Sequence, residues 1–500
     1  MSPYVRKVPT ASGAQAVQIV WSKKRGRVEM EHIGSAHTEG ELELLWAIAR
    51  QRMHGSDQDE LDLGLAAPDQ TAVEVTGTRM GRLLDAIAAV YRQMGFDVAT
   101  GHDAVFEQLV TARIIEPTSK QDAARVLDEA GMAAASYPTV KRRLPGYAQP
   151  AFRAALSGAC AATADLGPSA LVLYDVTTLW FETDTADGFR EPGFSKERRL
   201  EPQITVGLLT DASGNPLLLD SFEGNTAETK TMIPLIQAFV EAHGVLGVTV
   251  VADAGMMSEA NLKDIEDAGW TFIVGGKLPE VPYQVKQWQR ENPDTQPPNG
   301  LVLTQPTLMG TKTDLRTRTT YYQYRADRAR RSLHGIDTQV AKAEKAVAGQ
   351  AAIKRNRFVT LSGGSRTVNR DLEAKVRALA GWKPYVTNLD APADFVIDAY
   401  HRLWQVEHSF RMSKHDLKAR PVYARKRDSI DAHLAVVFAA LAVSKRIEHA
   451  TGWTISRFVK TLRRYRQVTL TTSQHTFTAD QPIPDDIGEA LAKIHGRQGD

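Results

Sequence analysis

The region from Ser169 to Gly276 constrains the fold more than any other part of the chain, because strand-like and helix-like segments alternate in it. Three short segments rich in branched and aromatic side chains come first, which is typical of β-strands. Helical patterns then alternate with two further buried strands. This order predicts strands at Leu171–Phe181, Gln203–Leu209, Pro216–Phe222, Val248–Asp253 and Trp270–Val274, with helices from Glu228 to about His243 and from Ser258 to about Ala268.

Such an order of elements indicates a mixed α/β sheet with helices packed on it. The segment Asp211–Asn215 has the composition of a tight turn, so the second and third strands should form a hairpin. Strands that are connected through helices pair in parallel by right-handed crossovers. If the first strand pairs in parallel with the Val248–Asp253 strand, Asp175 and Asp253 lie side by side. This is the ribonuclease-H-like arrangement, although the pattern by itself leaves the strand order open.

A second informative stretch, Tyr400–Lys414, contains no Pro or Gly and carries apolar residues at helical spacing, which predicts one helix. At about 100° per residue, one narrow face carries Tyr400, Leu403, Glu407, Arg411 and Lys414. A carboxylate that points inward needs a cation or a metal ion, because burial of an unpaired charge is costly. The alternative is a surface ion pair between Glu407 and Arg411, which stabilises a helix only slightly.

The N-terminal regions differ in composition from this core. Residues 1–53 are predicted to form a small β-hairpin followed by a helix, and residues 54–78 a linker. Residues 79–150 have the pattern of short helices joined by tight turns, and the last helix, Ser136–Leu144, is basic. They indicate either a helix-turn-helix-like DNA-binding region or an ordinary helical bundle with a solvated basic face.

The predicted α/β core has two parts that an insertion separates. The first part spans residues 165–277 and the insertion residues 278–385. The second part, residues 386–450, contains the Tyr400–Lys414 helix. The insertion combines a strand-like run with a strongly basic helix-like segment, so we expect a β-rich, basic domain. Residues 451–500 are predicted to form a helical segment and a polar tail.

Composition excludes several classes of protein. The 500 residues predict about two to four domains. The single cysteine, Cys160, excludes an intramolecular disulfide framework and a cysteine-based zinc site, which fits a reducing cytoplasm. No apolar run is long enough to predict a transmembrane helix, and no signal peptide is recognisable. The net charge is only +2, but the basic residues are clustered, which is compatible with nucleic-acid binding.

Three carboxylates stand out in this sequence: Asp175 within an apolar strand, Asp253 at a strand end and Glu407 on the later helix. Taken singly, either Asp can be a satisfied polar group of the fold. Three converging acids without a neutralising base favour hard divalent cations, which prefer oxygen ligands. Two such ions can hold the attacking and leaving oxygens of a phosphoryl displacement.

Several short blocks around these acids follow one another in a characteristic order. They are Leu-Tyr-Asp175-Val-Thr-Thr, Asp253-Ala-Gly-Met, Tyr385-Val-Thr-Asn388, the stretch with Tyr400, Trp404, Glu407, Phe410, Arg411 and Lys414, Arg420-Pro-Val-Tyr423 and Ala432-His433. Over roughly residues 105–447 the chain resembles the DDE insertion-sequence transposases with a Tyr-Arg-Glu-Lys type signature, in the bacterial group of long transposases of this kind.

The resemblance implies that Asp175, Asp253 and Glu407 are the catalytic residues and the metal ligands. The implied ion is Mg²⁺, with Mn²⁺ able to substitute. Tyr400 and Lys414 are implied to contact phosphates of the transposon end. The alternatives are core packing for Tyr400 and simple pairing with Glu407 or Asp416 for Lys414.

The sequence departs from the signature at one position. The signature Arg falls on Leu403, and Arg402 is displaced by about 100° around the helix. Arg411 is therefore the better candidate for a phosphate contact than Arg402, although both are candidate DNA-binding residues. Trp404 is a further candidate, because an aromatic ring can stack on an extruded base; core packing is its alternative.

Several polar residues near these candidates have a structural interpretation by default. We expect His401, His408 and His433 to be hydrogen-bonded structural residues rather than ligands. Thr177, Thr178 and Asn388 are plausible supports for the catalytic acids, with strand packing as the default.

The function that follows is a DNA transposase, which cleaves the ends of its element and joins the freed 3′-hydroxyl groups to target DNA. Its partners would be double-stranded DNA, as terminal inverted repeats and as target, and a second copy of the chain in a homodimer on two ends; no membrane is involved. The expected location is the bacterial cytoplasm, on the nucleoid when DNA is bound. A metal-dependent nuclease of the same fold and a non-catalytic DNA-binding derivative are alternatives, and a two-carboxylate glycosidase is a remote one.

Overall fold

A computed structural model shows that the chain forms two compact units, one of Met1–Thr163 with Arg411–Asp500 and one of Ala164–Phe410. The second unit is thus inserted in the sequence of the first. The structure describes residues 3–10, 13–24, 27–54, 74–164, 166, 169–183, 185–193, 200–245, 247–255, 257–293, 295–311, 314–351, 356–362, 365–419, 422, 424, 426–471 and 475–496. Within these residues no helix has both the length and the apolar character that crossing a bilayer requires.

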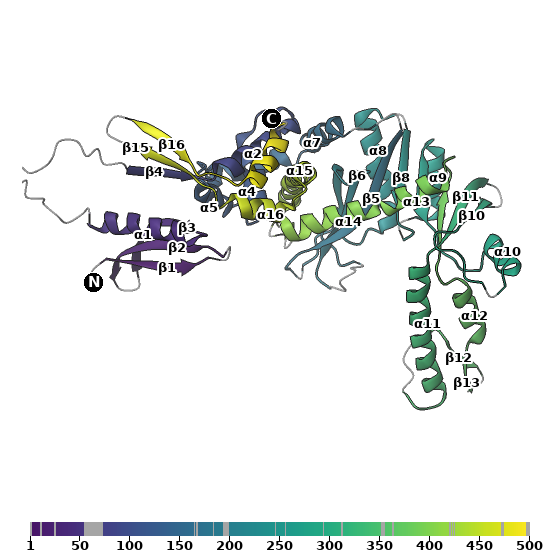
Figure 1. Cartoon of the computed structure of the whole chain (residues 1–500). Coiled ribbons are helices and arrows are strands. Elements are labelled where there is room, and N and C mark those ends of the chain that lie inside the picture. The colour runs from purple at the N-terminus through teal and green to yellow at the C-terminus, as the bar shows by residue number, and fades with distance from the viewer. Residues whose placement is uncertain are drawn as a thin grey trace, which may run out of the picture. The chain divides into compact units, whose positions relative to one another are not determined.

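An eight-stranded mixed sheet forms the centre of the second unit (Figure 1). Its strand order is β10-β11-β14-β9-β8-β5-β6-β7, and only β5–β8 and β8–β9 pair in parallel. The predicted mixed α/β sheet is therefore confirmed, and so is the parallel pairing of the first strand with the fourth. The strands are β5 (Ser169–Trp180), β6 (Gln203–Asp211), β7 (Pro216–Glu223), β8 (Gly247–Ala252), β9 (Thr271–Gly275), β10 (Val302–Thr311), β11 (Asp314–Tyr324) and β14 (Trp382–Thr387).

The predicted turn between β6 and β7 is organised by the side chain of Asp211. Its Oδ1 atom accepts hydrogen bonds from the backbone N–H groups of Ser213, at 2.8 Å, and Asn215, at 2.9 Å. Gly214 has a φ of +82°, a conformation that favours glycine over residues with a side chain. The turn therefore has a fixed shape, and a later helix packs against it.

Helices of the second unit begin and end where the sequence provides caps. Ser258 accepts a hydrogen bond from the Asn261 N–H at the start of α9, and Gly244 ends α8 in the left-handed region. The expected helix from Glu228 to His243 begins as a short 3₁₀ turn, Glu228–Lys230. The α-helices are α8 (Met232–His243), α9 (Glu259–Asp267), α10 (Tyr283–Glu291), α11 (Ala326–Val347), α12 (Arg370–Ala378), α13 (Ala393–His401) and α14 (Leu403–Arg411).

The predicted insertion, residues 278–385, contributes to the main sheet. Strands β10 and β11 and most of β14 come from it and extend the sheet beyond β9. Its basic helix-like segment forms α11, as expected. A small hairpin of β12 (Val359–Ser362) and β13 (Ser365–Val368) belongs to the same segment. It packs with α11 and α12 around a separate apolar cluster of Ile336, Val340, Ala343 and Phe358.

The expected single helix over Tyr400–Lys414 is wrong in detail. Helix α13 ends at His401, a turn at Arg402 follows, and α14 begins at Leu403. A π-helical turn, Met412–Asp416, follows α14. Tyr400 and Glu407 therefore lie on two different helices, and the predicted common face, which assumed about 100° per residue along one helix, does not exist.

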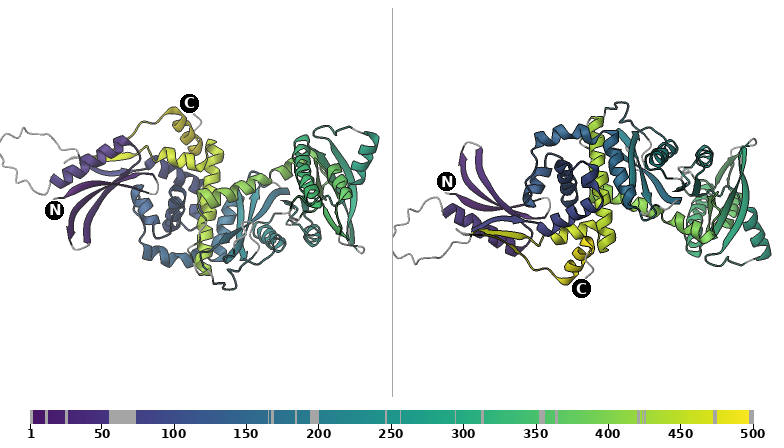
Figure 2. Two further views of the ribbon diagram at one scale, coloured as in Figure 1. Left: turned by 90° about the horizontal axis from the view of Figure 1, so that it is seen from below. Right: turned by 90° about the horizontal axis from the view of Figure 1, so that it is seen from above.

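The N-terminal part of the first unit is a three-stranded antiparallel sheet with one helix (Figures 1 and 2). The expected hairpin is thus incomplete, because β1 adds a third strand to β2 and β3. Helix α1 contacts all three strands and encloses an apolar cluster that includes Val17 and Ile19. The elements are β1 (Tyr4–Pro9), β2 (Gln15–Lys24), β3 (Arg27–Ala36) and α1 (Glu39–His54).

Helix α15 (Arg427–Thr451) is the centre of a helical bundle in the first unit. Nearly every residue from Ile430 to Ile447 is buried, as expected for a helix that is apolar on all sides. It contacts α2, α4, α6, α7, α16 and α17. The predicted helices of residues 79–150 are present, and Lys141, Arg142 and Arg143 of α6 are exposed. The other helices are α2 (Gly81–Gln93), α3 (Phe96–Ala99), α4 (Ala104–Ile115), α5 (Ala123–Glu129), α6 (Tyr137–Tyr147), α7 (Pro150–Thr163), α16 (Ile455–Leu462) and α17 (Asp485–His495).

A third sheet joins the two sequence segments of the first unit. Strand β4 (Glu74–Arg79) pairs with β15 (Gln467–Thr471), which pairs with β16 (Thr476–Asp480). The end of the predicted linker, 54–78, is therefore a strand, while residues 55–73 lie outside the described residues. The C-terminal region likewise contains a β-hairpin that the predicted helical segment and polar tail did not include.

Candidate active site

Asp175 lies on β5, and Asp253 directly follows the neighbouring parallel strand β8. The β5–β8 ladder runs from the pair Ser169 and Gly247 to the pair Leu173 and Val251. Two residues further along each strand, the same register reaches Asp175 and Asp253. Because side chains two residues apart point to the same face of a strand, both carboxylates lie on one face at the carboxyl end of the parallel ladder. The structure thus brings these two predicted acids together.

Tyr400 connects helix α13 with Asp253. Its hydroxyl group donates a hydrogen bond to Asp253 Oδ1 at 2.8 Å, and its ring is buried. The ring fits there because Gly275 ends β9: a Cβ atom at Gly275 would lie 2.6 Å from the Tyr400 hydroxyl oxygen. Burial and then the hydrogen bond to Asp253 raise the pKa of Tyr400 above its usual value, so the phenol keeps its proton and acts as a donor.

Glu407 lies on α14, which packs on the turn between β6 and β7. The Ser409 hydroxyl donates a hydrogen bond to the Gly214 carbonyl at 2.8 Å, and both Val406 and Ser409 are fully buried. Glu407 itself is exposed and makes no hydrogen bond or ion pair with any residue that the structure describes. The alternative of a surface ion pair with Arg411 is therefore not formed.

The three acids do not form one closed metal site in this structure. Within the described ranges, no group of three or more His, Cys, Asp or Glu side chains is arranged so that it could hold a metal ion. The charge of Glu407 nevertheless contributes, as the smallest of several causes, to the raised pKa of Tyr400. Asp253 and Glu407 thus both act electrostatically on the same phenol.

A comparison with protein families matches residues 167–443 to the transposase DDE domain. The chain belongs to the DDE transposase family. The matched segment begins at β5, ends within α15 and contains all three acids, so the match supports transposase activity in general. A comparison with curated proteins finds no match to this chain.

The predicted DNA-contact residues lie on α13, in the turn after it, on α14 and in the π-helical turn that follows. Arg402, in the turn between α13 and α14, and Trp404, on α14, are exposed, and Trp404 has 56% of its surface accessible. The core-packing alternative for Trp404 is therefore wrong. Arg411 is the exposed last residue of α14, and Lys414 is half-buried in the π-helical turn that follows. Both belong to the first unit.

Several of the polar side chains singled out from the sequence make structural contacts. The Asn388 side chain accepts a hydrogen bond from the Phe272 N–H at 2.9 Å and donates one to the Trp270 carbonyl at 3.2 Å, which holds the end of β14 against the start of β9. His401 Nε2 lies 3.3 Å from the Tyr385 hydroxyl. His433 is buried and hydrogen-bonds the Ala419 carbonyl at 3.0 Å. Thr177 and Thr178 are half-buried strand residues.

One basic residue beside the acids was not singled out from the sequence. The Lys383 ammonium nitrogen lies 4.1 Å from the centre of the Tyr400 ring and 5.6 Å from that of Tyr385. Burial lowers the pKa of Lys383 most, the charge of Arg328 lowers it further, and the charge of Asp253 opposes both. The sequence signal was present, because Lys383 directly precedes the Tyr385-Val-Thr-Asn388 block, but an isolated Lys in a strand indicates no function by itself.

Proposed function

We propose that this chain cleaves DNA at the ends of its element and joins the 3′-hydroxyl ends to target DNA by two-metal-ion phosphoryl transfer. The observation that supports the proposal is the parallel β5–β8 pairing inside the segment that matches the transposase DDE domain, because continuing its register by two residues leads to Asp175 and Asp253.

We also infer that the core of the second unit is ribonuclease-H-like. The order β7-β6-β5-β8-β9, with an antiparallel meander followed by two parallel strands, supports this assignment. The strands beyond β9 then belong to an insertion of the family type, and the α2–α7 helices with their exposed basic residues in α6 are the proposed DNA-binding region.

The donor set fits a hard divalent ion such as Mg²⁺. The site offers two carboxylates on neighbouring strands, and Mg²⁺ in phosphoryl-transfer sites is usually held by one or two carboxylates, waters and substrate phosphates. Asp175 and Asp253 would hold the ion, and Glu407 would complete the set. When bound, Mg²⁺ or Mn²⁺ supplies positive charge that activates the attacking water or 3′-hydroxyl and stabilises the leaving oxygen.

The protein's own residues have distinct roles in this proposal. Tyr400 occupies Asp253 Oδ1 with a hydrogen bond, which orients the carboxylate and leaves its other oxygen available. Glu407, exposed and without a partner among the described residues, is free to bind when DNA is present. The exposed Trp404 ring offers a face on which an unpaired base can stack.

The proposed partners are double-stranded DNA, as terminal inverted repeats and as target, and a second copy of the chain on the paired ends. Arg402, Arg411 and Lys414 are the proposed phosphate contacts near the cut, and Tyr400 is proposed to act through its hydrogen bond to Asp253. Such a protein would work in the bacterial cytoplasm, on the nucleoid when bound to DNA.

Cleavage and joining of an end-sequence duplex by the purified full chain with Mg²⁺ tests the proposal. Wild type should yield nicked ends and strand-transfer products. Asp175→Asn, Asp253→Asn and Glu407→Gln should each reduce cleavage by about 100-fold or more, because each removes a metal ligand that supports several kcal/mol of transition-state stabilisation. Asp264→Asn, at an exposed position of α9, is the matched control and should cleave like wild type.

The products separate the alternatives. Cleavage without any joined product would indicate a nuclease of the same fold. Binding of end DNA without cleavage, with no effect of Mg²⁺, would indicate a non-catalytic DNA-binding protein. Full activity of Asp253→Asn would contradict the assignment of the acids.

A further inference from the structure

Three cations of the second unit lie on β14 and at the start of α11, and the charge of Asp253 acts on one of them, Lys383. Lys383 is on β14, and Arg325 and Arg328 are at the start of α11. None of them forms an ion pair with a residue in the described part of the chain. Arg328 instead donates to the backbone carbonyls of Gln323 and Gly381, both at 3.3 Å. A cluster of positive charges without ion-pair partners attracts anions.

Some other cations of the same unit are neutralised by carboxylates. Arg318 is buried between Glu266 and Glu259, with an Nε–Oε1 distance of 2.9 Å to Glu266. Lys263 pairs with Asp267 at 2.8 Å and with Asp314 at 2.9 Å. Lys383, Arg325 and Arg328 differ from these paired cations, because none of them has an ion-pair partner among the described residues.

We propose that Lys383, with Arg325 and Arg328, forms a phosphate-binding site beside Asp253 that receives the DNA backbone next to the reacting acids. This inference rests on the proposed function and adds a positioning residue to it. The charges of Lys383, Arg325 and Arg328 all act on His401, and the charges of Arg328 and Asp253 both act on Lys383, so the four basic residues and the acid lie within one electrostatic neighbourhood.

The geometry connects Lys383 to the acids through Tyr400. The Lys383 nitrogen lies over one face of the Tyr400 ring, and the Tyr400 hydroxyl donates to Asp253. The Tyr385 ring packs edge-on against Tyr400, with 5.1 Å between the ring centres. Lys383 and Tyr385 are two residues apart on β14 and therefore point to the same face, which is the face of Tyr400.

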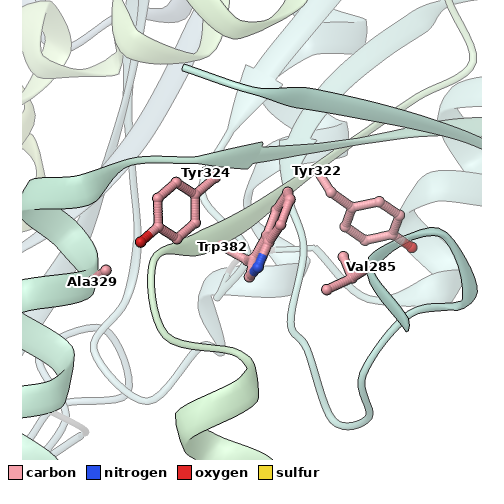
Figure 3. Packing of buried hydrophobic residues seen from close by; sticks show 5 residues of the cluster. All are labelled: Val285, Tyr322, Tyr324, Ala329 and Trp382. Carbon is pink, nitrogen blue, oxygen red and sulfur yellow. The ribbon is translucent and has the colours of Figure 1, made fainter. Parts of the chain in front are cut away.

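A buried apolar cluster fixes the backbone on which the three cations stand (Figure 3). Each cation is next in the chain to a buried residue of this cluster: Arg325 follows Tyr324, Arg328 precedes Ala329, and Lys383 follows Trp382. The cluster also contains Val285 and Tyr322. The Tyr324 and Trp382 rings are 5.4 Å apart and meet edge to face. The cations are thus attached to a rigid junction of β11, α11 and β14, which favours a preorganised site.

A cation beside the acids favours the approach of a DNA phosphate. A phosphodiester that approaches Asp175 and Asp253 meets two negative charges on the protein, and a nearby ammonium group offsets that repulsion. Position 403, where the signature has Arg, carries a Leu that is buried, so α14 offers no cation there. Lys383 supplies a charge from β14 instead, and its ammonium nitrogen lies 4.1 Å from the centre of the Tyr400 ring.

Equilibrium binding of the full chain to a fluorescent duplex from the element's end, in EDTA and over a range of salt concentrations, tests the inference. Lys383→Gln should weaken binding at every salt concentration and reduce the slope of log K against log [salt] by about 0.9, the value for one lost phosphate contact. Lys383→Arg should keep the wild-type slope. Lys263→Gln is the matched control, because its charge is already neutralised, and should bind like wild type.

A second measurement covers the case in which Lys383→Gln does not fold. The Lys383→Cys variant should form a covalent adduct with duplexes that carry a bromoacetyl group on single backbone phosphates near the end, where the thiolate displaces bromide. Lys263→Cys should not react, and the wild-type thiol, Cys160, is buried.

The outcomes separate this inference from the proposed function, because binding in EDTA needs no catalysis. An unchanged salt slope for Lys383→Gln, together with absence of the Lys383→Cys adduct, would overturn the inference even if wild type transposes DNA. The reduced slope in a protein that joins no ends would support the phosphate site and contradict only the transposase reaction.

Discussion

At the scale of single residues, Tyr400 is the side chain that links the helix region to the strand acids. Tyr400→Phe keeps the buried ring and removes only the hydrogen bond to Asp253. Because Asp253 is exposed and can be rehydrated, we expect the variant to lose about 1 kcal/mol of stability or less. Cleavage should fall about tenfold, since the carboxylate loses its orientation. Thermal unfolding and end-cleavage rates measure the two effects.

Tyr385→Phe is the control for that variant. Its hydroxyl donates to Gln323 and faces His401, but it does not contact either Asp. It should cleave at a rate close to wild type. Equal cleavage by Tyr400→Phe and wild type would assign Tyr400 to core packing alone.

The buried His433 gives a pH prediction. Burial lowers its pKa well below the usual 6.5, and the charges of Arg113 and Lys120 act in the same direction. Below about pH 6.5 the unfolded chain therefore binds a proton that the folded chain does not, so stability is lost as pH falls. The loss due to His433 should be about 1.4 kcal/mol per pH unit below that point.

Urea unfolding between about pH 7 and pH 5, followed for wild type and His433→Gln, measures this contribution. Gln keeps a donor for the Ala419 carbonyl but cannot titrate. The variant should show a flatter decline of stability toward acid pH. A decline as steep as that of wild type would mean that other groups cause the acid sensitivity.

At the scale of elements, the junction of β14 with α11 depends on Gly381. Its φ is +90°, and a Cβ atom there would lie 2.5 Å from the Tyr324 ring and 2.8 Å from the Ala329 Cβ atom. Gly381→Ala should therefore destabilise the second unit by about 2 to 3 kcal/mol through strain and steric overlap. Thermal unfolding of the full chain measures the change.

Gly349→Ala separates these two causes. Gly349, at the end of α11, also has a positive φ, of +73°, but a Cβ atom there meets nothing within 4 Å. It should cost about 1 kcal/mol from backbone strain alone. If both variants lose the same stability, steric overlap at Gly381 contributes nothing, and the side chains around it can move to make room for a methyl group.

The same elements show what the sequence could and could not predict. The sequence predicted strands and helices that make a parallel pairing of β5 with β8 possible, but it left the strand order open, and the structure shows this pairing. The helix break at Arg402 is not marked by Pro or Gly in the sequence. It lies just before α14, which packs on the turn at Gly214. The pairing of β14 with β9 and β11 is a tertiary contact between distant segments, so Lys383 could not be placed beside Asp253 from periodicity.

At the scale of the whole molecule, the sequence ranges of the two units predict which fragment of the chain can fold alone. The first unit is built from both ends of the sequence, since β4 pairs with β15 and α15 packs on helices of the N-terminal half. The second unit is one continuous segment, and all strands of its eight-stranded sheet come from that segment. A single uninterrupted segment with a complete sheet has the properties of an independent folding unit.

We therefore expect residues 164–410, produced alone, to unfold cooperatively on heating and to retain near-ultraviolet circular dichroism from their buried aromatic rings. A shorter fragment, residues 164–381, is the matched control. It lacks β14, which lies between β9 and β11, so β10 and β11 lose their connection to the rest of the sheet. This fragment should show no cooperative transition. If residues 164–410 also fail to fold while the full chain does, the acids depend on the first unit for their positions, and the site cannot be studied in isolation.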